Sequence, residues 1–189
     1  MTKNIMIVGV GGQGTLLASR ILGSAAMALG YDVKVSEVHG MSQRGGSVVT
    51  YVKYGDTVCS PIISEGEADV ILAFEELEAY RYLRYLKKGG EILVNTQNID
   101  PMPVIIGAAE YPTDIIEKMR AKGAAVVTVD ALSLALEAGS AKAVNVVLLG
   151  LMAARSGISS DVWMQALENT VAEKFLEMNK KAFALGQNA

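Results

Sequence analysis

The first stretch whose residue types and spacing could bind a ligand is a glycine-rich turn near the N-terminus. An apolar run over residues 5–8 leads into glycines spaced as Gly-x-Gly-x-x-Gly, and apolar residues then recur at helical spacing. The candidate site residues of this turn are Gly9, Gly11, Gly12, Gln13 and Gly14. Glycines let a backbone approach a ligand closely, and the first N–H groups of a helix attract anions. The pattern therefore predicts a strand, a turn and a helix that bind a phosphate-bearing ligand, or a turn that only packs the helix against a sheet.

A polar segment over residues 36–46 is the second candidate site. Its candidate site residues are Ser42, Gln43, Arg44, Gly45 and Gly46. The planar guanidinium of Arg44 suits a phosphate or a carboxylate, and the two glycines would let backbone amides approach the same anion. Because both segments should follow strands at the carboxyl edge of one sheet, we predict that Gln13 and Arg44 donate to a single anion. The alternative is that Arg44 pairs with Glu37 and only orders its own loop. The only histidine, His39, is expected to form hydrogen bonds within the loop and not to act as a general base.

The order of the elements along the chain predicts an α/β fold, a three-layer Rossmann-like mixed sheet with helices on both faces and a helical C-terminal region. Periodicity and turn residues place strands at 5–8, 33–35, 69–74, 92–95 and 124–129, and helices at 13–29, 75–86, 112–122 and from 141 onward. The first helix then joins the first two strands as a β-α-β unit. Gly89 and Gly90 are interpreted as the stop of the second helix.

Two further patterns refine this fold. Residues 47–53 and 57–60 are rich in β-branched side chains and flank a glycine-containing turn, which predicts a hairpin and therefore antiparallel strands in the sheet. Glu75, Glu76 and Glu78 gather at the start of the helix that follows the next strand. Acidic residues there suit the helix dipole, and the alternative is that they contribute to the crevice at the sheet edge.

The position of Glu37 bears on which ligand the glycine turn would bind. In dinucleotide-binding folds an acidic residue at the end of the second strand binds a ribose, about 20 residues beyond the glycine motif. Glu37 lies 23 residues after Gly14, and a polar loop follows it instead of a second crossover helix. NAD binding is therefore the less favoured prediction.

Size and composition limit the classes of protein that fit. A chain of 189 residues, 51% of them apolar, predicts a single domain over residues 1–189 with a core of its own. The net charge is −3 and the 17 Lys and Arg residues form no basic block, so nucleic-acid binding is not expected. The longest apolar run near the C-terminal half, residues 143–154, is shorter than the ~20 residues that span a bilayer. We expect no membrane span, no signal peptide and a cytoplasmic location.

The chain lacks the residues that most redox and hydrolytic centres need. One histidine and one cysteine, Cys59, cannot supply a zinc site or the four cysteines of an iron–sulfur cluster. The glycine turn carries no lysine of the Walker type, and Gly55-Asp56 lacks the next glycine of a thiamine diphosphate motif. These absences indicate a protein that works as part of a larger enzyme.

Several motifs together resemble the gamma-type domain of the 2-oxoacid:ferredoxin oxidoreductases. They are the Gly-Val-Gly-Gly-Gln-Gly turn at 9–14, the segment 36–47, Ser60-Pro61, and residues 173–183. The resemblance spans nearly the whole chain, and His-Gly-Met-Ser-Gln before Arg-Gly-Gly is similar to the indolepyruvate branch of the family.

The resemblance implies a role that the residues alone do not define. A large partner subunit would carry thiamine diphosphate and the iron–sulfur clusters and would reduce ferredoxin, while an aryl pyruvate is decarboxylated oxidatively to an aryl-acetyl-CoA. This chain would bind neither cofactor, and its glycine turn and Arg44 loop would contact either coenzyme A or the partner. Two rival functions stay open, a stand-alone NAD(P)-binding oxidoreductase and a nucleotide- or CoA-binding regulatory module. A stand-alone oxidoreductase would need a group for hydride transfer, such as a Tyr-x-x-x-Lys motif. The segment that starts at Tyr80 has Arg84 at the position of the lysine.

Overall fold

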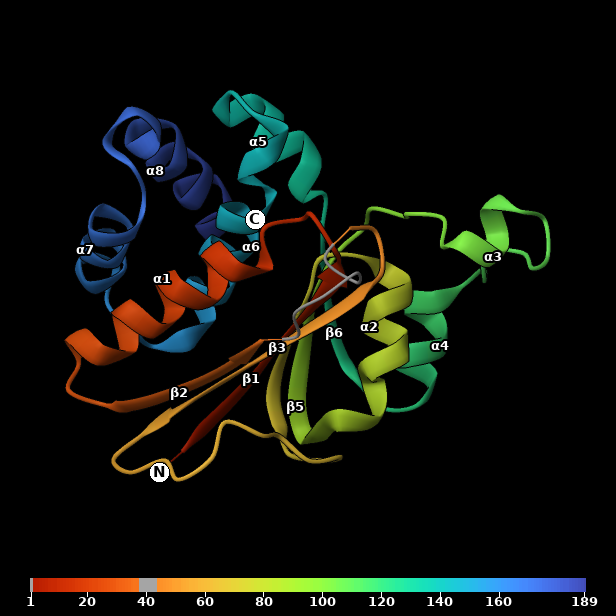
Figure 1. The fold of residues 1–189 in the computed structure, drawn as a ribbon, viewed down its shortest axis with the longest axis horizontal. Coiled ribbons are helices and arrows are strands. Elements are labelled where there is room, and N and C mark those ends of the chain that lie inside the picture. The colour runs from red at the N-terminus through yellow and green to blue at the C-terminus, as the bar shows by residue number, and fades with distance from the viewer. Residues whose placement is uncertain (1, 38–43) are drawn as a thin grey trace.

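The computed structural model describes residues 2–37 and 44–189. These residues form a six-stranded mixed sheet in the order β2-β3-β1-β4-β5-β6 (Figure 1). The strands are β1 Lys3–Val10, β2 Asp32–Glu37, β3 Ser47–Gly55, β4 Ala68–Ala73, β5 Leu86–Asn95 and β6 Ala125–Val129.

Strand direction decides which loops meet at one edge of the sheet. β1, β4, β5 and β6 are parallel neighbours, whereas β3 lies antiparallel between β1 and β2. β2 therefore runs in the same direction as β1 without touching it. The ends of all five parallel-running strands and the start of β3 consequently lie at a single carboxyl edge, where open α/β sheets bind ligands.

Helices cover both faces of the sheet (Figure 1). One face carries α1 Thr15–Ala28, α5 Ala131–Ala138, α6 Val144–Ser156, α7 Ser160–Thr170 and α8 Glu173–Gln187, and the other carries α2 Glu76–Tyr82 and α4 Ile115–Ala121. A short helix, α3 Met102–Ile105, stands apart from both layers. Alternate residues of β1 serve the two cores, with Ile5 and Ile7 in one hydrophobic cluster and Met6 and Val8 in the other. The predicted three-layer α/β fold with a helical C-terminal region is confirmed.

The C-terminal helices approach one another unusually closely. A Cβ atom added at Gly150 of α6 would lie 2.2 Å from the carbonyl oxygen of Phe183, and one added at Gly186 of α8 would lie 2.0 Å from that of Val147. Only glycine permits two helix backbones to come so near. Trp163 of α7 packs beside Phe183, with ring centroids 5.9 Å apart, so α6, α7 and α8 form one buried unit.

The predicted hairpin over 47–60 is wrong, although the antiparallel character that it implied is correct. β3 pairs on one side with β1 and on the other with β2, so both of its edges are occupied. Residues 57–60 are not a strand, and the N–H of Val58 instead donates to the carboxylate of Asp32 over 2.9 Å. The turn after β3 resembled a hairpin locally, but long-range pairing with β1 decided the topology.

Two other expectations also need correction. Gly89 and Gly90 do not stop a helix, because α2 ends at Tyr82, a short 3₁₀ turn covers Leu83–Tyr85, and β5 already begins at Leu86. A Cβ at Gly90 would lie 2.9 Å from the carbonyl oxygens of Ala68 and Asp69, so the glycine allows β4 and β5 to pair closely. The first two strands and α1 also do not form an adjacent β-α-β unit, because β3 separates β1 from β2.

Candidate functional site

The glycine turn connects β1 to α1 at the carboxyl edge of the sheet. Gly12 and Gly14 have φ values of 104° and 84°, in the left-handed region that other residues rarely adopt. Gly14 is the N-cap of α1, and in the described part of the chain no side chain caps this helix and no acidic residue lies in its first turn. Among the described residues, no side chain caps the first N–H groups of α1, so an external acceptor can reach them, and anion binding there stays a prediction.

The Arg-Gly-Gly segment lies directly against this turn. The N–H of Gly11 donates to the carbonyl of Gly46 over 2.8 Å, and the N–H of Gly45 donates to the carbonyl of Gly11 over 3.2 Å. These bonds extend the antiparallel pairing of β1 and β3, whose last partners are Val10 and Ser47. The expectation that the two motifs meet at one edge is therefore confirmed.

Gln13 has a structural role that the sequence did not predict. Its Oε1 accepts a hydrogen bond of 2.7 Å from the N–H of Val10, and its Nε2 donates over 3.0 Å to the carbonyl of Phe74 at the end of β4. The side-chain amide therefore ties the turn to the neighbouring strand, and the joint donation of Gln13 and Arg44 to one anion stays a prediction. Gly9 provides the space, because a Cβ there would lie 2.7 Å from the Oε1 of Gln13 and 2.9 Å from the Cβ of Phe74.

Gly14 and Gly12 differ in how closely neighbouring atoms approach them. A Cβ at Gly14 would lie 2.6 Å from the Nδ2 of Asn145, which donates to the carbonyl of Gly14 over 3.2 Å. No atom of residues 2–37 or 44–189 lies within 4 Å of a Cβ at Gly12, so these residues leave this face of the turn open. The contact of Asn145 with the glycine turn was not predicted from the sequence. The feature that could have indicated it is a single amide side chain in the otherwise apolar run of α6.

A hollow of about 280 Å³ lies over the start of α1. Its lining residues come from the glycine turn, the beginning of α1, the end of β2 and the beginning of β3, and they are Gly11, Gly12, Gly14, Thr15, Leu16, Glu37, Val48 and Thr50. The carboxylate of Glu37 accepts a hydrogen bond of 2.8 Å from the hydroxyl of buried Ser19. Backbone amides and one carboxylate thus face the same small space.

Arg44 is exposed and precedes Gly45, whose N–H bonds to the carbonyl of Gly11 in the lining of this hollow. Between Arg44 and Glu37, both of them in the described part of the chain, there is no ion pair, so the alternative in which this pair orders the loop has no support. Ser42 and Gln43, the other two candidate residues of the loop, lie outside the described residues, as does His39. Their assignment to the site stays a prediction.

A buried amide holds the strand ends together beneath the turn. The Nδ2 of Asn95, at the end of β5, donates over 3.2 Å to the carbonyl of Phe74, the oxygen that also accepts from Gln13. The Oδ1 of Asn95 accepts a bond of 3.0 Å from the N–H of Ala131, the first residue of α5. Asn95 is fully buried, so these bonds fix the ends of β1, β4, β5 and β6 relative to one another.

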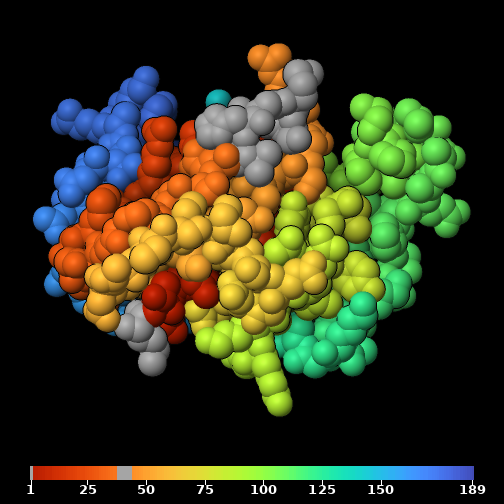
Figure 2. Space-filling model, turned by 60° about the horizontal axis from the view of Figure 1, so that its bottom comes forward, coloured from red at the N-terminus to blue at the C-terminus, as the bar shows by residue number. Residues whose placement is uncertain are grey.

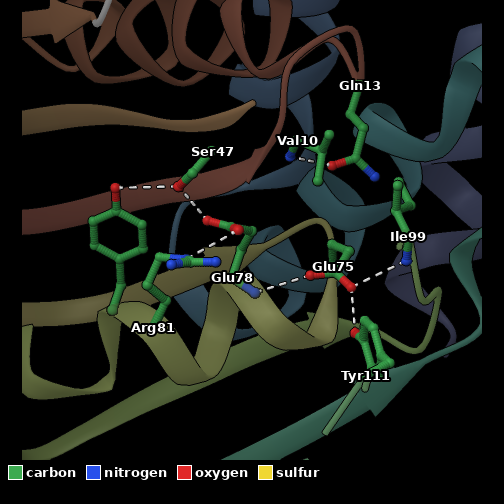
Figure 3. A network of polar contacts seen from close by, with 9 residues as sticks. Val10, Gln13, Ser47, Glu75, Glu78, Arg81, Ile99 and Tyr111 are labelled. Carbon is green, nitrogen blue, oxygen red and sulfur yellow. Dashed lines mark hydrogen bonds and ion pairs between the residues drawn. The ribbon is translucent and has the colours of Figure 1, made fainter. Parts of the chain in front are cut away.

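The acidic residues at the start of α2 serve the structure of this edge (Figure 3). Glu75 caps α2, because its Oε2 accepts a bond of 2.9 Å from the N–H of Glu78, as the helix-dipole reading expected. Glu78 points toward Ser47 at the beginning of β3 and accepts a hydrogen bond from its hydroxyl, and it also pairs with Arg81 at 3.2 Å. Burial raises the pKa of the Glu78 carboxyl, while the contacts with Ser47 and Arg81 oppose that rise.

Larger hollows lie at the opposite edge of the sheet, around residues 87–90. They measure about 450 and 620 Å³, and lysines and arginines contribute much of their lining. Three of these cations pair with acids at short range, Lys87 with Asp69, Arg84 with Glu65 and Arg155 with Glu91. Because acids neutralise part of this positive charge and the glycine turn with the start of α1 lies at the other edge, the carboxyl edge is the better candidate for an anion.

The family described as pyruvate ferredoxin/flavodoxin oxidoreductase matches residues 4–189. The chain belongs to this family. Among its relatives, an indolepyruvate oxidoreductase subunit IorB from Thermococcus kodakarensis is 46% identical over 191 residues, which cover 98% of this chain and 95% of that protein. The resemblance drawn from the sequence motifs is thereby confirmed.

Two further family members show how widely the domain is used. The gamma subunit of a keto/oxoacid ferredoxin oxidoreductase from Geobacter sulfurreducens superposes with a TM-score of 0.73 at 27% identity, covering 98% of this chain and 96% of that one. The ketoisovalerate oxidoreductase subunit VorA of Methanothermobacter marburgensis is 29% identical over 187 residues. That match covers 96% of this chain but 35% of VorA, so the domain also occurs within a longer polypeptide.

In residues 2–37 and 44–189, no group of three or more His, Cys, Asp or Glu side chains is placed to hold a metal ion. The same residues contain no helix that is both long and apolar enough to cross a membrane.

Proposed function

We propose that this chain is the small subunit of an indolepyruvate:ferredoxin oxidoreductase. The observation that carries the proposal is the 46% identity to an IorB subunit over nearly the full length of both chains. The assembled enzyme decarboxylates an aryl pyruvate oxidatively, joins the resulting acyl group to coenzyme A and transfers the electrons to ferredoxin.

The redox chemistry belongs to a large partner subunit. Iron–sulfur clusters need several cysteine thiolates, and this chain has only Cys59, which is exposed. Thiamine diphosphate, when bound by the partner, supplies the stabilised carbanion that makes decarboxylation possible. The small subunit is accordingly inactive alone, and its contribution is to bind and orient groups at its carboxyl edge.

The hollow over α1 suits one phosphate of coenzyme A. The open face of Gly12 lets a phosphate approach the backbone amides of the turn, and the helix dipole favours its negative charge. Exposed Arg44 adds a guanidinium that can hold phosphate oxygens in two parallel hydrogen bonds. Glu37 would repel a phosphate placed directly on it, so its carboxylate is better suited to accept a hydrogen bond from a hydroxyl of the ligand.

The rival functions fit the fold less well. A dinucleotide-binding oxidoreductase places the second strand beside the first, so that an acid at its end reaches the ribose of a ligand on the glycine turn. Here β3 lies between β1 and β2. No feature of the described residues favours a stand-alone regulatory module.

The test is reconstitution with the separately purified large subunit. Ferredoxin reduction should require both subunits and coenzyme A, and it should be faster with indolepyruvate than with pyruvate or 2-oxoglutarate. Full activity of the large subunit without this chain would remove the proposed role. A preference for pyruvate would keep the role but reassign the substrate.

A further inference from the structure

An arm, residues 98–113, stands out from the body of the protein. It leaves the sheet after β5, carries α3 near its tip and returns to α4, and in both overall views it projects from one end of the molecule (Figures 1 and 2). Met102, Ile105 and Ile106 at its tip are 65%, 65% and 69% exposed. None of the three belongs to either hydrophobic cluster of the protein. Large apolar side chains grouped in this way on a projection usually mark an interaction surface.

The tip has a defined shape of its own. Gly107, with φ 73°, ends α3 in a Schellman arrangement, in which the N–H of Ala108 donates over 2.8 Å to the carbonyl of Pro103 and the N–H of Gly107 donates over 2.9 Å to that of Val104. The arm therefore holds its apolar side chains outward without help from the body.

One buried carboxylate fastens both ends of the arm. The Oε1 of Glu75 accepts a bond of 3.2 Å from the N–H of Ile99 and a hydrogen bond from the hydroxyl of Tyr111 (Figure 3). Glu75 is only 1% exposed, so this fastening is part of the fold. Because Glu75 also caps α2, the position of the arm is fixed relative to the carboxyl edge.

The charges on the arm restrict what can cover it. No lysine or arginine occurs between Lys88 and Lys118, whereas Asp100 and Glu110 flank the apolar tip and are exposed. A complementary surface is apolar at its centre and basic at its rim. A second copy of this chain would bring the same acids together around the contact, which like-charge repulsion disfavours.

We propose that the tip of the arm docks into an apolar groove with a basic rim on the large partner subunit. This inference rests on the proposed function. The longer relative VorA carries this domain within one polypeptide, which indicates that the domain works beside further protein of its own complex. The arm also begins at the same edge of the sheet as the glycine turn and the Arg44 loop, so one partner surface can cover all three.

The experiment compares two Ile→Glu variants of the whole chain. Ile106→Glu places a carboxylate at the tip, and Ile62→Glu makes the same change at a site that is 53% exposed and follows β3 at the opposite edge. Affinity for the purified large subunit and the melting temperature of the isolated chain are measured for both. Ile106→Glu should weaken binding roughly tenfold or more without lowering the melting temperature, and Ile62→Glu should change neither. Binding of Ile106→Glu within about twofold of the native chain would overturn the proposal.

Two further measurements separate the possible failures. A double variant, Asp100→Lys with Glu110→Lys, should slow association with the large subunit if the rim of the groove is basic, and unchanged or faster association would overturn that assignment. If the native chain itself does not bind the large subunit, the proposed function fails together with the arm. If the native chain dimerises alone and Ile106→Glu abolishes the dimer, a second copy covers the arm and only the present inference fails.

Discussion

The N–H of Gly11 donates a hydrogen bond of 2.8 Å to the carbonyl of Gly46, and this contact joins the two most informative motifs of the chain. It exists because β3 runs antiparallel to β1 and starts where β1 ends. As a result, the glycine turn and residues 44–46 lie together at the carboxyl edge, where we propose that the ligand binds.

Arg44→Lys should separate ligand binding from loop ordering. Lysine keeps the charge but cannot form two parallel hydrogen bonds, so we expect a loss of roughly tenfold or more in CoA-dependent turnover of the assembled enzyme. The melting temperature of the isolated chain should hardly change, because Arg44 is exposed. The melting temperature is measured on the isolated variant, and turnover is measured after the same batch of variant has been reconstituted with the large subunit.

Arg84→Lys is the matched control for this change. Arg84 is also exposed, pairs with Glu65 at 3.1 Å and lies at the opposite edge of the sheet. An exposed ion pair contributes about 0–1 kcal/mol, so this variant should keep both turnover and stability. A lower melting temperature with normal turnover in Arg44→Lys would instead assign that arginine to loop structure.

Two Gly→Ala variants in helices should shift stability in opposite directions. At Gly150 the added methyl would lie 2.2 Å from the carbonyl oxygen of Phe183, so overpacking should exceed the helix-propensity gain of about 1 kcal/mol and destabilise the protein by about 1–3 kcal/mol. At Gly23 of α1 the methyl would lie 3.7 Å from Val33, an ordinary contact, and should stabilise by about 0.5–1 kcal/mol. Urea unfolding of the isolated chain measures both, and a stabilising shift at Gly150 would contradict the close packing of α6 on α8.

The sequence predicts well where local pattern and long-range structure agree. The strand that runs into Gly9 and the helix that follows Gly14 are local features, and both are confirmed. The layered fold follows from alternating strands and helices of ordinary length. The meeting of the two segments at one edge was also predictable, but the bond between Gly11 and Gly46 depends on the pairing of β1 with β3, which was not predicted.

The errors come from partners that are distant in the chain. Residues 57–60 have the residue types of a strand, but β1 and β2 occupy both edges of β3, so no edge of β3 is left for them to pair with. The bond from Gln13 to the carbonyl of Phe74 was not predicted, because no local pattern reveals that acceptor. The position of Glu75 at the start of α2 was predicted to suit the helix, and it does. Its second role, as the acceptor that fastens the base of the arm, depends on Ile99 and Tyr111, which are distant in the sequence.

Glu78→Gln should change how stability depends on pH. Burial raises the pKa of this carboxyl, so the folded state binds more protons than the unfolded state, and the free energy of unfolding falls as pH rises from the unfolded pKa of about 4.3 through the higher folded value. The amide removes this fall, so the variant should gain stability relative to the native chain as pH rises from the unfolded pKa through the folded pKa. Urea midpoints across that range test this, with exposed Glu137→Gln as the control. A relative loss of stability with rising pH would contradict the assigned burial effect.

Tyr111→Phe should weaken the base of the arm. The Tyr111 hydroxyl donates to the buried carboxylate of Glu75, and burial together with this bond raises the pKa of the phenol. Loss of a hydrogen bond to a charged group should destabilise the chain by about 1.5–3 kcal/mol and speed amide exchange at Ile99. Tyr51→Phe, at a half-buried tyrosine of β3, is the control and should have little effect. Equal effects of the two variants would show that the bond to Glu75 contributes nothing specific.

The most direct test of the account is amide hydrogen exchange of the assembled complex with and without coenzyme A. If the carboxyl edge binds the anionic ligand, coenzyme A should slow exchange at residues 11–17 and 44–47, where the turn and the Arg44 loop meet. Exchange at residues 86–91, beside the larger hollows of the opposite edge, should not change. Protection confined to residues 86–91, or absent from both segments, would contradict the assignment of the ligand to the glycine turn.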